Sequence, residues 1–122
     1  MKQEFIIGDI VMYKNRIHTI IDILASNGYE LSYVRHPVSP VRLSGVSLTP
    51  EILEKNGWKD DGYDWYRLPT KRAYLYITKD MTTLGEFLVC VGLGRHNIAS
   101  ISFVHQLQHL LFGLGLKREM EV

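Results

Sequence analysis

The sequence has few of the features that support a disulfide scaffold or a membrane anchor. Its single cysteine, Cys90, excludes an internal disulfide and is compatible with a reducing compartment. No apolar run approaches the roughly 20 residues that cross a bilayer. The first residues also lack the apolar region of a signal peptide. We therefore expect a cytoplasmic protein that has no membrane partner.

The sequence also lacks an excess of charge of either sign. It has 14 Lys and Arg against 13 Asp and Glu, a net charge of +1. Proteins that bind long nucleic acids through phosphates usually carry a strong basic excess, so this balance disfavours that class. The chain has 122 residues, 46% of them hydrophobic, which is enough for one core without metal or disulfide support. We expect a single domain over 1–122, with 1–46 and 47–122 as parts of one compact unit.

The first third of the chain predicts a β-meander. Segments 9–13 and 17–24 are rich in β-branched residues, and segment 29–35 alternates apolar and polar residues. Asn27-Gly28, between the second and third of these segments, is a strong signal for a tight turn, because both residues tolerate positive φ. This order of strands is similar to a small SH3-like barrel.

The rest of the chain predicts two helices and further strands. Thr49 can cap a short helix, which Gly57 can end in the left-handed conformation. We expect a fold of the α+β class, with a C-terminal helix packed on the sheet. The predicted elements after residue 46 are a helix between Thr49 and Gly57, strands at 63–68, 72–79 and 86–91, and a helix at 103–114. Residues 59–62 and 92–97 are expected to form a turn and a loop.

One face of the predicted hairpin is the strongest candidate for a binding surface. A connection of two or four residues puts the odd positions 63, 65 and 67 on the same face as Tyr74 and Tyr76, whereas three residues would break this register. Aromatic side chains beside arginine form stacking platforms or anchors for a protein partner. The alternative interpretation is cross-strand pairing that merely stabilises the hairpin, or a second layer of core beneath the short helix. The candidate residues are Tyr63, Trp65, Arg67, Tyr74, Tyr76 and Arg95.

The sequence contains no pattern typical of catalysis. His105 and His109 have the helical spacing of zinc proteases, but Gln106 stands where such enzymes need a glutamate. We expect this pair to be polar or to face an interface. Cys90 lies in an apolar strand, where a thiol should be inert. We therefore predict no catalytic residue, no metal and no cofactor. An enzyme would need distant histidines gathered beside a carboxylate.

Three stretches together resemble a group of small proteins encoded by bacteriophages and integrated mobile elements of gut bacteria. These stretches are 7–20, with its Gly-Asp start, 48–58, with Leu-Thr-Pro-Glu-Ile-Leu, and 104–112, with Val-His-Gln-Leu-Gln. Members usually carry asparagine and tyrosine where this chain has His109 and Leu111. The group has no established activity. The resemblance implies an accessory protein of a phage or mobile element that acts in a bacterial host cell.

These observations predict a noncatalytic binding module that acts on a protein partner. An inhibitor of a host defence protein would fit this class. The alternative is a binder of nucleotides or short nucleic acids that uses the same face of aromatic residues and arginines. Phe112 and Leu116 also form a second, partly apolar helix face, which leaves a homo-oligomer open.

Overall fold

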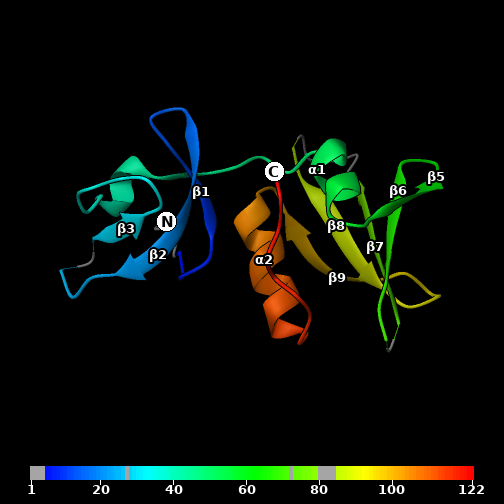
Figure 1. Cartoon of the computed structure of the whole chain (residues 1–122). Helices are drawn as coiled ribbons and strands as arrows, with labels where there is room; N and C mark the ends of the chain where they lie inside the picture. The colour runs from blue at the N-terminus through cyan, green and yellow to red at the C-terminus, as the bar shows by residue number, and fades with distance from the viewer. Residues whose placement is uncertain (1–4, 27, 72, 80–84) are drawn as a thin grey trace. The chain divides into compact units, whose positions relative to one another are not determined.

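The computed structural model describes residues 5–26, 28–71, 73–79 and 85–122 (Figure 1). It confirms the α+β class, with one antiparallel sheet of four strands and another of five. The contacts divide the chain into two units. The first comprises Met1–Val46 and Phe103–Met120, and the second comprises Ser47–Ser102 and Glu121–Val122. Within the described ranges, no helix is long and apolar enough to cross a membrane.

The first unit is built on the predicted β-meander. Its sheet has the order β3-β2-β1-β4, with the strands β1 (Ile10–Tyr13), β2 (Arg16–Ile23), β3 (Tyr29–Leu31) and β4 (Ser44–Gly45). A short 3-10 helix, η1 (Pro40–Arg42), follows β3. Asn27 of the predicted Asn27-Gly28 turn lies outside the described residues. One cluster of buried residues in this unit consists of Phe5, Val11, Tyr13, Ile20, Tyr29, Leu31, Val38 and Leu43.

The C-terminal helix, α2 (Val104–Gly113), lies within one residue of its predicted bounds at each end. The side chain of Gln106 accepts a hydrogen bond from the backbone N–H of Phe103 at 3.0 Å, which caps the first turn. Gln108 fixes the helix to the start of β1. Its Oε1 accepts from the N–H of Ile10 at 2.9 Å, and its Nε2 donates to the carbonyl of Gly8 at 3.1 Å. The helix therefore belongs with the first sheet, whereas the sequence grouped it with residues 47–122.

The second unit begins with the predicted short helix, α1 (Pro50–Lys55). The hydroxyl of Thr49 accepts from the N–H of Ile52 at 3.3 Å, as expected of an N-cap. Gly57 has a φ of +88°, so the expected left-handed end is confirmed. The sheet has the order β5-β6-β7-β8-β9, with the strands β5 (Lys59–Gly62), β6 (Trp65–Pro69), β7 (Tyr74–Lys79), β8 (Phe87–Val91) and β9 (His96–Ile101).

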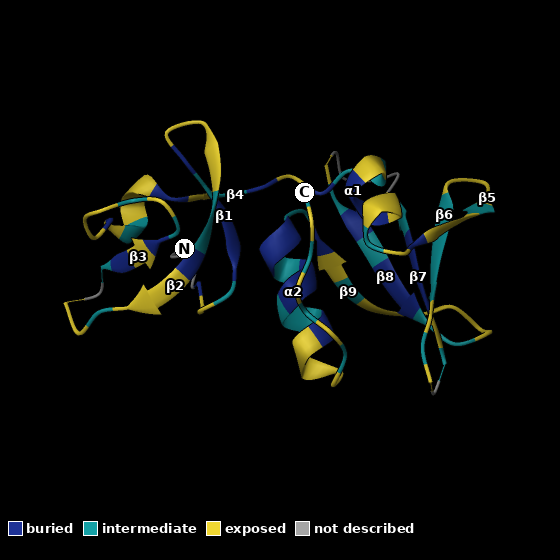
Figure 2. Cartoon of the chain, viewed as in Figure 1, coloured by how far each residue is buried: buried dark blue, intermediate teal, exposed yellow. Residues whose placement is uncertain are grey.

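This sheet has five strands where the sequence predicted three. The prediction of a turn at 59–62 was wrong, because this segment is the edge strand β5. The predicted loop at 92–97 is a turn only as far as residue 95, because the edge strand β9 begins at His96. An edge strand pairs through its backbone on one side only, so it does not need the apolar side chains of a central strand. Figure 2 shows this difference, since β7 and β8 are largely buried and β5 and β9 are largely exposed.

Candidate functional site

The register of the β6–β7 hairpin brings most of the predicted surface together. Four residues separate the two strands, and Arg67 lies opposite Tyr76 in the antiparallel pair. Since Trp65 and Tyr74 occupy the same phase of the alternation, all four side chains share one face of the sheet. This part of the register prediction is confirmed. We call Trp65, Arg67, Tyr74 and Tyr76 the aromatic face.

Tyr63 does not lie in this strand. It occupies the turn between β5 and β6, where its φ is +54°. Its side chain is 99% exposed. The predicted position of Tyr63 beside Trp65 in a strand was therefore wrong, because β6 starts at Trp65.

The rings of the aromatic face form a corner. Trp65 and Tyr76 meet nearly at right angles, with an interplanar angle of 85° and centroids 6.3 Å apart. Tyr74 lies at the same 6.3 Å separation from Tyr76 and is tilted by 46°. Tyr76 is only 6% exposed, whereas Tyr74 is 40% exposed. The corner therefore has a buried floor and a partly open side.

The guanidinium of Arg95 fills this corner. Its Cζ lies 4.4 Å from the ring centroid of Trp65 and 4.8 Å from that of Tyr76, so it makes two cation–π contacts. Its Nη2 donates to Oδ2 of Asp61 at 3.1 Å. Arg95 has a φ of +49° in the turn between β8 and β9. We call Trp65, Tyr76 and Asp61 the cage.

Arg67 forms the second positive charge on this face. Its Cζ lies 5.0 Å from the ring centroid of Tyr74, and its Nη1 lies 3.9 Å from Oδ1 of Asp61. Its Nε is buried and has no hydrogen-bond partner among the described residues. Asp61 thus faces two guanidinium groups and holds that of Arg95 more closely.

Asp61 is a functional candidate that the sequence did not identify. In the sequence it stands between Asp60 and Gly62, a pattern that is typical of a solvated turn. In the structure, the irregularity between Asp60 and Gly62 in β5 accompanies the approach of Asp61 to Arg67 and Arg95. The contact with Arg95 joins residues 34 positions apart, so no local spacing could have indicated it.

Cys90 lies beside Tyr76 on the same side of the sheet as the aromatic face. It is the partner of Tyr76 in the β7–β8 pair, and it is buried. Burial raises the pKa of the Cys90 thiol, and the positive charge of Arg95 partly opposes this rise. The raised pKa favours the thiol over the reactive thiolate, which is the behaviour expected from its apolar strand.

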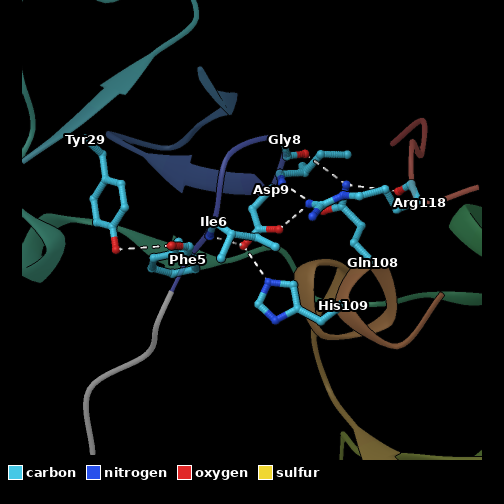
Figure 3. Close-up of polar contacts among 9 residues, drawn as sticks. Phe5, Ile6, Gly8, Asp9, Tyr29, Gln108, His109 and Arg118 are labelled. Atoms are coloured by element: carbon cyan, nitrogen blue, oxygen red, sulfur yellow. Dashed lines mark hydrogen bonds and ion pairs between the residues drawn. The ribbon is translucent and has the colours of Figure 1, made fainter. Parts of the chain in front are cut away.

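A second polar cluster, in the first unit, is centred on Asp9 (Figure 3). Its carboxylate is fully buried and accepts from the N–H of Ile6 at 2.8 Å and from Nε2 of His109 at 2.7 Å. A third bond comes from Nη2 of Arg118. Figure 3 shows both side chains pointing at Asp9, His109 from α2 and Arg118 from the chain beyond it. The cluster ties the start of β1 to α2 and to the C-terminal segment.

His105 is packed as an aromatic residue. Its ring stacks on Phe103 with centroids 5.7 Å apart and contacts Phe5 at 4.8 Å. Burial lowers the pKa of His105, although the charge of Asp9 opposes this effect. The expectation of a polar or interface-facing pair was wrong for His105, because Phe5 covers it from a distant part of the chain. In the described residues, no three His, Cys, Asp or Glu side chains are grouped to hold a metal.

Five of the six predicted surface residues therefore lie together in the second unit. They are Trp65, Arg67, Tyr74, Tyr76 and Arg95. Asp61 joins them, and Tyr63 lies in the neighbouring turn. A comparison of the chain with known protein families, curated proteins and solved structures found no match.

Proposed function

We propose that the protein is a noncatalytic binding module that docks a protein partner through the aromatic face. The observation that carries this proposal is the cluster of two arginines with Trp65, Tyr74 and Tyr76 on a partly open sheet face. Trp, Tyr and Arg are the residue types that dominate the binding energy of protein interfaces. A surface of this kind supports a partner that covers Tyr74 and Trp65.

The position of Arg95 on the aromatic rings favours a protein over a nucleotide. Base stacking needs an open ring face, and Arg95 already covers the corner between Trp65 and Tyr76. Asp61 lies in the same cluster. Its carboxylate repels phosphates. The nucleotide interpretation therefore remains the second candidate.

The sequence resemblance to proteins of bacteriophages and mobile elements supports a role as an accessory protein in a bacterial host cell. Its most specific stretch is the C-terminal Val-His-Gln-Leu-Gln segment, which forms the first turns of α2. An accessory protein without catalytic groups acts by occupying a surface of another protein. Inhibition of a host defence protein is one role of this kind.

Capture from a lysate of the bacterial host tests the proposed function. The wild type is compared with Trp65→Ala and with Tyr33→Asn, a matched control that removes a fully exposed aromatic side chain from the first unit. Tyr33 has a φ of +61°, which asparagine tolerates. We expect the wild type and the Tyr33 variant to retain the same protein. Trp65→Ala should lose most of it, since a central anchor contributes about 2 kcal/mol or more.

Two results would contradict this proposal. Equal recovery with Trp65→Ala would show that the aromatic face is not the docking surface. Material that nuclease treatment releases from the wild type, but that is missing from Trp65→Ala, would favour the nucleotide or nucleic-acid interpretation at the same face.

A further inference from the structure

We propose that the cage is a receptor for an arginine side chain of the partner protein, and that Arg95 is a built-in occupant which the partner displaces. This inference rests on the proposed function and names the chemistry of the partner. Its basis is the position of the Arg95 guanidinium between Trp65, Tyr76 and Asp61.

The cage has the groups that recognise a flat organic cation. A guanidinium needs aromatic faces for its π-surface and a carboxylate oxygen for its N–H groups. Trp65 and Tyr76 supply two rings at 85°. Asp61 supplies the oxygen, 3.1 Å from Nη2 of Arg95. The internal occupant therefore identifies the class of ligand that fits, because any arginine side chain can make the same three contacts.

Asp61 is the charge that the cage keeps when Arg95 leaves. Asp61 then faces Arg67 at 3.9 Å as its nearest described positive charge. Lys59 lies opposite Arg67 on this face, whereas Asp60 lies opposite Tyr66 and belongs to the other face of the sheet. An acidic peptide or a phosphate would meet the Asp61 carboxylate without the compensation that Arg95 gives.

The attachment of Arg95 suits displacement. It lies at the end of a turn that also contains Gly92 and Gly94, and Gly92 has a φ of +77°. Its ion pair with Asp61 is partly exposed, with 39% of the Arg95 side chain and 24% of the Asp61 side chain accessible, and exposed pairs are weak. A partner arginine replaces these contacts one for one. The partner then gains any additional contact with the open side of Tyr74.

Arg95 should therefore reduce the affinity for weak cationic ligands. A ligand binds only the fraction of molecules whose cage is open, so its apparent dissociation constant rises by the inverse of that fraction. Removing the occupant should tighten binding of an arginine probe by about tenfold, which corresponds to about 1.4 kcal/mol. A partner with additional contacts overcomes this competition, whereas an isolated arginine does not.

The first experiment titrates N-acetyl-arginine methylamide into the protein and follows the indole N–H signals by NMR. Trp65 reports on the cage, and the buried Trp58 is an internal reference. The test variant is Arg95→Asn, since asparagine is too short to reach the rings and tolerates the positive φ of this position. The matched control is Arg35→Ala, an exposed arginine of the first unit.

We expect Arg95→Asn to bind the probe about tenfold more tightly than the wild type or Arg35→Ala. The double variant Arg95→Asn/Asp61→Asn should lose this binding, and an acetyl-norleucine methylamide probe should not shift the Trp65 signal. Equal affinity of Arg95→Asn and the wild type would overturn the proposal. Undiminished binding in the double variant, or a Trp65 shift with adenosine monophosphate in place of the arginine probe, would overturn it too.

The second experiment measures the affinity of the captured partner for the wild type, for Arg95→Asn and for Trp65→Ala. It separates this inference from the proposed function. Tighter binding to Arg95→Asn with loss of binding to Trp65→Ala supports the cage as an arginine receptor. Weaker binding to both variants overturns the inference, since Arg95 itself then contacts the partner, but leaves the proposed function intact. Unchanged binding to both overturns both proposals. A wild-type dimer that dissociates in Arg95→Asn would overturn the assignment to a separate partner and make a second copy of the chain the source of the arginine.

Discussion

Replacing Asp9 with asparagine should destabilise the first unit strongly. Asp9 is fully buried and accepts hydrogen bonds from Ile6, His109 and Arg118. Asparagine has the same shape, but it has no charge and only one acceptor oxygen. Its amide N–H groups would then face donors of the cluster. The Arg118 side chain, only 12% exposed, would lose its charge partner.

The magnitude follows from these contacts. Removing one member of a buried ion pair costs about 3–5 kcal/mol, since the other charge is left without compensation. The one oxygen that asparagine keeps can still accept the hydrogen bond from the N–H of Ile6, and the backbone packing is unchanged in an isosteric variant. We therefore expect a loss near the lower bound, about 3 kcal/mol, in the free energy of unfolding. The matched control is Asp22→Asn. Asp22 is exposed and, within the part of the chain that the structure describes, accepts only from its neighbour Ile23, so this change should cost less than about 0.5 kcal/mol.

Urea unfolding followed by far-UV circular dichroism is the appropriate assay. Both tryptophans, Trp58 and Trp65, belong to the second unit. Their fluorescence would therefore not report directly on the unfolding of the first unit. A midpoint for Asp9→Asn that equals the midpoint for Asp22→Asn would refute the reasoning. In that case the buried carboxylate would contribute no more than a surface residue.

Three further predictions concern packing and titration. Gly45→Ala puts a Cβ 2.6 Å from the ring of Phe103 and should lower the free energy of unfolding by about 1–3 kcal/mol. Gly113→Ala meets no described atom within 4 Å and should stabilise α2 by about 0.5–1 kcal/mol. Equal melting temperatures of the two variants would contradict this pair of predictions. Burial lowers the pKa of His105, so the unfolded chain binds its proton more readily and stability falls as the pH drops below about 6.5. His105→Phe should flatten this slope in urea titrations at pH 5 and 7, and an unchanged slope would refute it. Burial raises the pKa of the Cys90 thiol, so at pH 8 iodoacetamide should label the native protein about tenfold more slowly than the urea-unfolded chain, and equal rates would contradict this account.

The sequence predicted those features that depend on neighbours along the chain. The cap at Thr49 and the left-handed Gly57 follow from local hydrogen bonding and backbone freedom. The shared face of Trp65, Arg67 and Tyr76 follows from the two-residue period of a strand and a connection of four residues. Each of these features depends on a stretch of fewer than about 20 consecutive residues, so the sequence pattern alone could predict it.

The missed features depend on contacts between distant residues. Asp9 meets Arg118 across 109 positions, and Asp61 meets Arg95 across 34. The expectation that His105 is polar or faces an interface was wrong because the burial of His105 depends on Phe5, which is far away in the sequence. The edge strand β9 carries mostly exposed residues, so its hydrophobic pattern does not distinguish it from a loop.

The position of the Arg95 guanidinium in the cage is the central claim, and NMR can measure it directly. The side-chain protons of Arg95 should resonate upfield of those of the exposed Arg35, because the rings of Trp65 and Tyr76 lie 4.4 Å and 4.8 Å from its Cζ. Trp65→Ala should remove most of this shift. Arg95 signals that match those of Arg35 in the wild type would contradict the account, since the cage would then have no internal occupant.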